Sequence, residues 1–160
     1  MRDAIMMAVT GNEVIRAEIR WSERGVTGIH LYHGPAVVEG EDPFGAVAFI
    51  QAHLDGRPAG MPRLDLHLSP FRRRVYGRLV RIPWGEVMTY GELARELGTS
   101  PRAVGRAMAT NPVPIIYPCH RVIAAGHIGG FGGAVGIKVY LLEHEARTAP
   151  LPGDAERQRW

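Results

Sequence analysis

TYGELARELGTSPRAVGRAMATN, residues 89–111, is the stretch that decides the fold of the C-terminal half of this chain. Thr89 and Glu92 have the spacing of a capping box, in which each side chain satisfies a free amide at the start of a helix. Gly98 stands where a helix commonly ends. Ser100, followed by proline, is typical of a second cap and first turn. Two short helices joined by a glycine-containing turn predict a helix-turn-helix.

The second of these predicted helices carries a pair of arginines. Arg102 and Arg106 are four residues apart, so they share one face. Val104 and Met108 have the same spacing and predict the buried stripe of the helix. A helix that presents donors beside such a stripe is typical of nucleic-acid reading. Asn111, which precedes a proline, is expected to end it.

Further helices are predicted on both sides of this pair. The first is capped by Ser69, begins with Pro70 and is stopped by Pro83. It carries an apolar stripe at four-residue spacing and several arginines on its other faces. The last predicted helix covers residues 137–145. The prolines of residues 112–118 hold the intervening backbone extended.

The N-terminal part shows strand patterns instead. Residues 14–21 alternate in polarity, which predicts a half-buried strand, and residues 27–31 predict a returning one. Asp42 and Pro43 are interpreted as the cap and first turn of a helix that runs to Leu54. Alternating leucines at 64, 66 and 68 predict a third strand. The chain is therefore expected to be α+β, with a sheet-and-helix lobe over residues 1–68 and a mainly helical lobe over residues 69–160.

Charge differs between these two parts. Residues 1–68 carry six basic and nine acidic side chains, whereas residues 69–160 carry thirteen basic and seven acidic ones. The net charges are thus −3 and +6. A basic C-terminal part favours a polyanion as its partner, although an arginine-rich solvated face is the alternative.

The bulk composition excludes several classes of protein. No apolar run is long enough for a membrane span, and a secretory signal is disfavoured because the N-terminus lacks a basic leader. A single cysteine excludes an internal disulfide and a cysteine-rich zinc site. We therefore expect no metal, no cofactor and a cytoplasmic location.

That single cysteine, Cys119, is the candidate nucleophile. An unperturbed thiol, with a pKa of about 8.5, is only a few per cent ionised at neutral pH, so it needs a base or a positive environment. His120 adjoins it, but a link between neighbouring side chains requires a turn or a bridging water. Glu145, or less favourably Glu143, could orient the imidazole. A lone cysteine is more often a small buried apolar residue.

The surroundings of Cys119 resemble a known family. Residues 118–122, PCHRV, are similar to the active-site signature of the O6-alkylguanine-DNA alkyltransferases. Four further regions resemble that family's blocks in the same order, between about Phe71 and Glu145: YGELA (90–94), RAVG with AM (102–108), NPVP (111–114) and LLEHE (141–145). The resemblance implies a ribonuclease-H-like N-terminal lobe and a winged helix-turn-helix in the C-terminal lobe.

The resemblance also implies roles at the acceptor. Cys119 would accept the alkyl group irreversibly, so that each molecule acts once. His120 would remove the thiol proton through a water, and Glu145 would hold His120. Asn111 would brace the turn before the cysteine. Tyr90 would help to rotate the nucleotide out of the duplex and donate to the base.

The remaining implied roles concern DNA and the extruded base. Arg102 would fill the gap left in the base stack, and Met108 with the loop around Phe131, Gly132 and Gly133 would form the pocket walls. The carbonyls of Cys119 and Val122 would receive the exocyclic amine of guanine. The expected partner is double-stranded DNA that contains O6-alkylguanine, and O4-alkylthymine is a second expected substrate.

Three positions depart from the family pattern. Tyr117 replaces an aliphatic residue, Phe131 replaces a common tyrosine, and Ala134 replaces a common glycine. These departures leave open the range of alkyl groups that the pocket accepts. The protein is expected to be a monomer that can cooperate on DNA. Two alternatives remain: a non-catalytic helix-turn-helix DNA-binding module with Cys119 in its core, and a thiol hydrolase or peroxidase that acts without nucleic acid.

Overall fold

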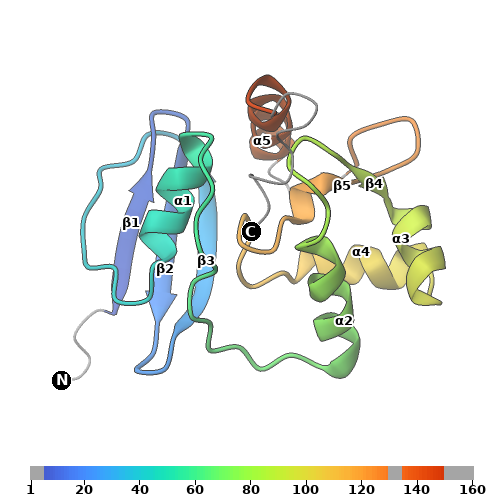
Figure 1. Cartoon of the computed structure of the whole chain (residues 1–160), viewed down its shortest axis with the longest axis horizontal. Helices are drawn as coiled ribbons and strands as arrows, with labels where there is room; N and C mark the ends of the chain where they lie inside the picture. The colour runs from blue at the N-terminus through green and yellow to red at the C-terminus, as the bar shows by residue number, and fades with distance from the viewer. Residues whose placement is uncertain (1–5, 130–134, 150–160) are drawn as a thin grey trace. The chain divides into compact units, whose positions relative to one another are not determined.

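A computed structural model describes residues 6–129 and 135–149, whose contacts divide into two compact units (Figure 1). Of the described residues, the first unit contains residues 6–67 together with Pro112–Ile116, and the second contains Leu68–Asn111, residues 117–129 and residues 135–149. The segment Pro112–Ile116 joins the first unit because the carbonyl of Pro112 accepts a hydrogen bond from the amide of Ile29 at 2.8 Å. The described helices and strands confirm the α+β class.

The first unit is built on an antiparallel sheet in the order β1-β2-β3. The two predicted strands are confirmed as β2 (Ile15–Trp21) and β3 (Val26–His33), and Ile15, Ala17 and Ile19 of β2 are buried. β1 (Met7–Gly11) was not predicted. Its three central residues are all buried, so it has no alternation of polarity from which a strand could be inferred.

The predicted start of the helix in the first unit is wrong by three residues. The helix expected from Pro43 is α1 (Ala46–Leu54), which begins three residues later after Gly45 in the left-handed conformation. Asp42 nevertheless caps it from a distance, since its carboxylate accepts from the amides of Val47 and Ala48 at 2.9 and 3.0 Å. In Figure 1, α1 packs beside β1.

The strand predicted at residues 64–68 is absent from the described structure. Leu64 makes only an isolated bridge to Val26, through hydrogen bonds of Val26 to Arg63 and of Asp65 to Val26. The chain then turns to the second unit, so Leu68 packs against the second unit's core rather than extending the sheet.

The second unit contains four helices and a short parallel pair of strands in its described part. The helices are α2 (Pro70–Leu79), α3 (Tyr90–Leu97), α4 (Pro101–Ala109) and α5 (Val135–Arg147). β4 (Met88–Thr89) pairs with β5 (Val122–Ile123), with Met88 opposite Val122 and Thr89 opposite Ile123. A 3-10 turn, η1 (Cys119–Arg121), immediately precedes β5.

The predicted starts of α2, α3 and α4 are confirmed by their caps, whereas α5 begins at Val135, two residues before the predicted start. Ser69 accepts from the amide of Arg72, Ser100 accepts from the amide of Ala103, and Thr89 and Glu92 form the complete capping box. Gly98 ends α3 in the left-handed conformation. α2 ends at Leu79, earlier than the predicted stop at Pro83.

α3 and α4 pack side by side over one core with α2 (Figure 1). Tyr76 joins α2 to the end of α4, because its hydroxyl donates to the carbonyl of Ala107 at 2.7 Å and accepts from Arg72 at 3.0 Å. Arg72 also donates to the carbonyl of Thr110. These bonds fix the end of α4 just before Asn111. None of the described helices is both long and apolar enough to cross a membrane.

Candidate functional site

Cys119 begins the η1 turn, and the chain before it is held by hydrogen bonds. The side-chain amide of Asn111 donates to the carbonyl of Tyr117 at 2.8 Å, and the same carbonyl accepts from the amide of Cys119 at 2.7 Å. The Asn111 side chain also forms a hydrogen bond with the Cys119 sulfur, which lowers the pKa of the thiol. Asn111 thus contacts both the turn and the sulfur.

The sulfur of Cys119 lies almost entirely out of solvent. The residue is 5% exposed and belongs to the core of the second unit, with Val104, Ala107 and Val122 as neighbours in that cluster. Burial is the main influence on the thiol, and it raises the pKa of Cys119 to about 11. In the resting protein the candidate nucleophile is therefore a neutral thiol and not a thiolate.

A buried ammonium group lies near this thiol. Lys138 of α5 is fully buried and donates from Nζ to the carbonyl of Val122 at 2.6 Å. Its Nζ is also 5.6 Å from the centre of the Tyr90 ring, a cation–π contact. The positive charge lowers the pKa of Cys119, whereas burial lowers the pKa of Lys138 itself. This contact offsets part of the cost of ionising the sulfur.

Tyr90, the first residue of α3, lies next to the same charges. Burial and the nearby Cys119 raise the pKa of its hydroxyl, which therefore stays protonated and can donate a hydrogen bond. Gly129, at φ +85, comes so close that an added Cβ would lie 3.1 Å from Cε2 of Tyr90. The absence of a side chain at Gly129 is what permits this approach.

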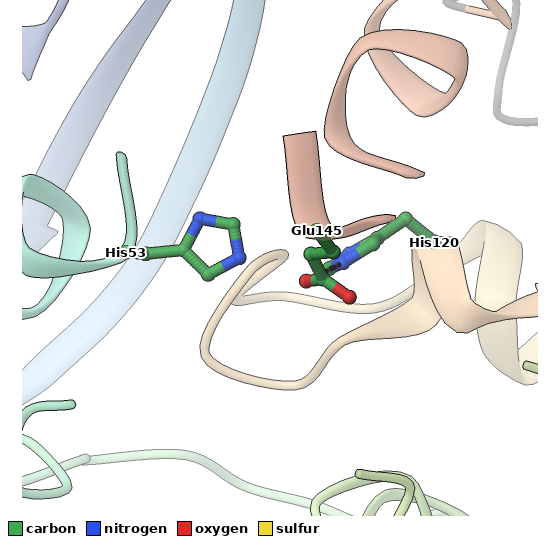
Figure 2. A group of neighbouring side chains, drawn as sticks. All are labelled: His53, His120 and Glu145. Atoms are coloured by element: carbon green, nitrogen blue, oxygen red, sulfur yellow. Dashed lines mark hydrogen bonds and ion pairs between the residues drawn. The ribbon is translucent and has the colours of Figure 1, made fainter. Parts of the chain in front are cut away.

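His120 and Glu145 form a buried pair (Figure 2). Nε2 of His120 lies 2.6 Å from Oε2 of Glu145, with His120 fully buried and Glu145 1% exposed. Burial is the main influence that lowers the pKa of His120, so the imidazole is neutral and able to accept a proton. η1 contacts α5, which places the two side chains together.

Arg121 binds the same carboxylate. Its Nε donates to Oε1 of Glu145 at 2.8 Å and its Nη2 donates to Oε2 at 2.9 Å. The third guanidinium nitrogen, Nη1, donates to the carbonyl of Ile82 at 2.7 Å, and the guanidinium lies 5.7 Å from the ring centre of Trp84. Glu145 thus accepts two hydrogen bonds from Arg121 and pairs with His120, an arrangement that suits a hydrogen-bonding relay.

The predicted DNA-contacting residues take different positions. Arg102 is exposed in the first turn of α4, and Met108 is half-buried on α4 against the core that contains Cys119. Val122 is buried, and its carbonyl already accepts from Lys138, which leaves one lone pair for another donor. The predicted wall residues Phe131, Gly132 and Gly133, and also Ala134, lie outside the described residues.

Tyr117 is explained by packing. Its ring stacks on that of Tyr76 with the centroids 4.9 Å apart and the planes at 19°. The larger side chain at this position therefore extends the contact between the turn and α2.

Sequence reasoning missed Arg121 and Lys138 as residues of the site. Lys138 is the only lysine of the chain and falls between Ile137 and the buried Leu141, a signal that a charged side chain lies on the inner face of α5. Arg121 lies within the PCHRV motif, but sequence gives no sign of which carboxylate it binds.

Known proteins resemble this chain both in sequence and in fold. Residues 70–147 match the family model described as 6-O-methylguanine DNA methyltransferase, DNA binding domain. A methylated-DNA–protein-cysteine methyltransferase of Saccharolobus islandicus is 46% identical over 102 residues, which cover 63% of this chain and 68% of that protein. Its counterpart in Sulfolobus acidocaldarius is 48% identical over 94 residues, which cover 58% of this chain and 61% of the relative.

Solved structures are similar over more of the chain. The crystal structure of Mycobacterium tuberculosis OGT in complex with DNA has a TM-score of 0.70 and 34% identity, and it covers 84% of this chain and 89% of that one. The crystal structure of the O6-methylguanine methyltransferase of the same organism has a TM-score of 0.74 and 31% identity, with 91% and 95% covered. The similarity therefore extends beyond residues 70–147.

Proposed function

Since this chain belongs to the family of methylated-DNA–protein-cysteine methyltransferases, we propose that Cys119 is the residue that receives the alkyl group from DNA. Direct repair of DNA by alkyl transfer to the protein is the activity of the chain, and DNA is its partner. The observation that carries the assignment is that Cys119 is the only cysteine and directly precedes the buried His120–Glu145 pair. The family resemblance inferred from the PCHRV motif is confirmed by the family model and the sequence relatives.

In the proposed reaction the sulfur attacks the alkyl carbon on O6 of guanine. A bond forms between sulfur and carbon, the bond between carbon and O6 breaks, and its electron pair stays on the base. The thiol proton passes through a water to His120, which is neutral because burial lowers its pKa. Because the pKa of Cys119 is raised to about 11, the thiol is neutral before the reaction and has to lose its proton in the course of it.

Tyr90 is proposed to stabilise the departing guanine. Its hydroxyl is protonated because its pKa is raised, so it can donate to O6 as negative charge develops there. Asn111 is proposed to hold the turn that presents the sulfur, and the carbonyls of Cys119 and Val122 to receive the exocyclic amine. The product is a thioether, which no group of the site can reverse, so each molecule acts once.

The DNA-binding role is proposed for the α3–α4 pair. Because O6 lies inside the duplex, the damaged nucleotide must leave the base stack before reaction. The exposed Arg102 at the start of α4 is proposed to fill the vacated space, and Met108 is proposed to line the pocket. Most phosphate contacts fall to arginines and backbone amides, since the single lysine is buried.

The finer features of the partner are also proposals. We expect duplex DNA with O6-alkylguanine as the main substrate, O4-alkylthymine as a second one, and a monomer that can cooperate on DNA. A cytoplasmic location is favoured by the single free cysteine, because a reducing compartment preserves a thiol.

One experiment tests the assignment of the acceptor. The protein is incubated with a duplex that contains one O6-methylguanine and is then digested, and the peptide that contains Cys119 is weighed. We expect the mass to rise by one methyl group in place of a hydrogen, and Cys119→Ala to abolish the transfer while it still binds the duplex. Duplex binding without the mass gain would instead favour a non-catalytic helix-turn-helix module. Turnover of a thioester or peroxide would favour a hydrolase or peroxidase.

A further inference from the structure

The carboxylate of Glu145 binds two side chains of the η1 turn at once. His120 Nε2 lies 2.6 Å from Oε2, while Arg121 Nε lies 2.8 Å from Oε1 and Arg121 Nη2 lies 2.9 Å from Oε2. All three residues are at least nine-tenths buried. Two adjacent residues reach one carboxylate because a 3-10 turn, unlike a strand, does not direct neighbouring side chains to opposite faces.

The guanidinium fixes the charge of this carboxylate. Arginine stays protonated under all ordinary conditions, and its paired N–H groups match both oxygens of a carboxylate. A carboxylate that accepts two such bonds is ionised and offers acceptors only. Glu145 is therefore held as an anion, although its burial alone would favour the neutral acid.

An ionised Glu145 determines which nitrogen of His120 carries the proton. Because Oε2 can only accept, Nε2 of His120 must be the donor. In a neutral imidazole the other nitrogen, Nδ1, then holds the lone pair that can take up a proton. If Glu145 were protonated or rotated, its hydroxyl could donate to Nε2 and the ring would adopt the opposite tautomer.

We propose that Arg121 is a positioning residue for alkyl transfer: by holding Glu145 ionised and in one orientation, it selects the His120 tautomer with hydrogen on Nε2. The inference rests on the proposed function, in which the Cys119 proton passes to His120. That proton arrives at Nδ1, His120 becomes the imidazolium, and Glu145 remains an anion throughout. The Arg121–Glu145 pair is neutral overall and keeps its charges, so the new charges of the transfer lie on His120, as the imidazolium, and on the departing guanine, as its anion.

The direct test is the tautomer of His120. With 15N-labelled histidine, the ring signals of His120, assigned with His120→Gln, should show hydrogen on Nε2 in the wild-type protein. Arg121→Met should shift the population toward hydrogen on Nδ1, whereas Arg121→Lys should keep part of the original tautomer because it retains the charge. An unchanged tautomer in folded Arg121→Met would overturn the inference.

Transfer rates supply the second readout. In single-turnover assays with free O6-benzylguanine, Arg121→Met should be slower by roughly tenfold or more, since general-base catalysis is worth at least that much. In the background of Glu145→Gln the same change should cost less than about twofold, because its target is already lost. Equal losses in both backgrounds would show that Arg121 acts without Glu145.

Controls separate positioning from folding. Trp84→Phe alters the ring beneath the guanidinium without touching the bonds to Glu145, so it should change stability and leave the tautomer unaltered. If Arg121→Met does not fold, the test uses Arg121→Lys. The lysine ammonium can bind Glu145 at one point only, so transfer should be slower and both tautomers of His120 should be populated. A transfer rate and a tautomer population equal to those of the wild type would overturn the inference. Methylation of wild-type Cys119 is measured beside them. Its absence would contradict the proposed function, whereas its presence with an unaffected Arg121 variant would contradict only this inference.

Discussion

At the scale of single residues, the thiol of Cys119 determines how the reaction begins. A neutral thiol with a pKa of about 11 cannot serve as a stored thiolate, so reactivity depends on groups that favour ionisation only when the substrate is present. Lys138 and Asn111 both lower the pKa of the thiol, but burial outweighs them.

The raised pKa has a consequence for stability. In the unfolded chain the thiol ionises near its ordinary pKa of about 8.5, whereas in the folded protein it keeps its proton until about pH 11. The unfolded state therefore binds fewer protons between these values, and the free energy of unfolding falls as pH rises through this range. Relative to the ionised state at high pH, the stabilisation from this group is complete below about pH 8.5 and amounts to on the order of 3 kcal/mol.

Denaturant unfolding at several pH values between 7 and 10.5 checks this expectation. The wild-type protein should lose stability more steeply with rising pH than Cys119→Ala, which lacks the group but keeps the tyrosines that also titrate there. Parallel curves for the two proteins would contradict the raised pKa.

A second prediction at this scale concerns Arg102. The side chain of Arg102 is exposed on α4 and is proposed to enter the base stack. Arg102→Ala should therefore slow repair of a duplex by tenfold or more, because stacking of a side chain on a base is worth roughly 1–3 kcal/mol. Reaction with free O6-benzylguanine should stay within about twofold, since no stack has to be filled. Arg106→Ala is the matched control on the same face, and equal losses on duplex and free base would reject the role of Arg102.

A residue of the site could be predicted from the sequence only if it lies in a recognisable motif. PCHRV indicates Cys119 and His120, but the contact of Arg121 with Glu145 spans 24 residues and no pattern in the sequence encodes it. Lys138 was missed because a lone lysine in a helix is normally exposed, whereas here a carbonyl of Val122 and the ring of Tyr90 compensate for its burial.

At the scale of elements, the caps determine where the helices of the second unit begin. Ser69 and Ser100 each accept one amide hydrogen bond ahead of a first-turn proline, so the two caps are chemically alike. They differ in that α4 carries the exposed Arg102, whereas α2 contributes Val75, Tyr76 and Leu79 to the buried core. This likeness offers a paired comparison of stability and DNA binding.

Ser100→Ala and Ser69→Ala should each reduce the free energy of unfolding by about 1 kcal/mol, the typical value of such a cap. Only Ser100→Ala should also weaken binding to duplex DNA, because the first turn of α4 frays when its amide loses the cap. Thermal unfolding and fluorescence anisotropy with a labelled duplex measure the two effects. Equal losses of affinity would show that α4 is not the reading helix.

Element prediction succeeded where local chemistry decides and failed where distant contacts decide. The caps at Ser69, Thr89 and Ser100 are local and were located correctly. β1 was missed because burial of successive residues removes the alternation on which strand prediction depends. The leucine pattern at 64–68 gave a strand that the structure lacks, since no neighbouring strand pairs beyond Leu64.

At the scale of the whole molecule, the acceptor belongs to the core that holds the second unit together. Cys119 clusters with side chains of α2, α3 and α4, among them Val75, Leu93 and Val104. An alkyl group on the sulfur adds volume to this packed interior, and overpacking costs roughly 1–3 kcal/mol. Repair therefore alters the stability of the protein as well as its chemistry.

The methylated protein should consequently melt several degrees lower than the unreacted one, given about 2–4 °C per kcal/mol for a chain of this length. Scanning calorimetry before and after reaction with O6-methylguanine measures the shift, and transfer of a benzyl group should produce a larger one. A control incubation of Cys119→Ala with the same DNA should leave its melting temperature unchanged. A methylated protein that melts no lower than the unreacted one would contradict the packing argument.

The solitary lysine gives this chain a built-in reporter. Lys138 is fully buried beside the acceptor and is the one lysine side chain in the sequence. Acylating reagents, and any cellular conjugation that needs a lysine amine, can reach that nitrogen only after α5 has come away from the turn it covers. The rate at which Lys138 is acylated therefore measures how often α5 separates from that turn. This rate should be higher for the alkylated protein than for the unreacted protein.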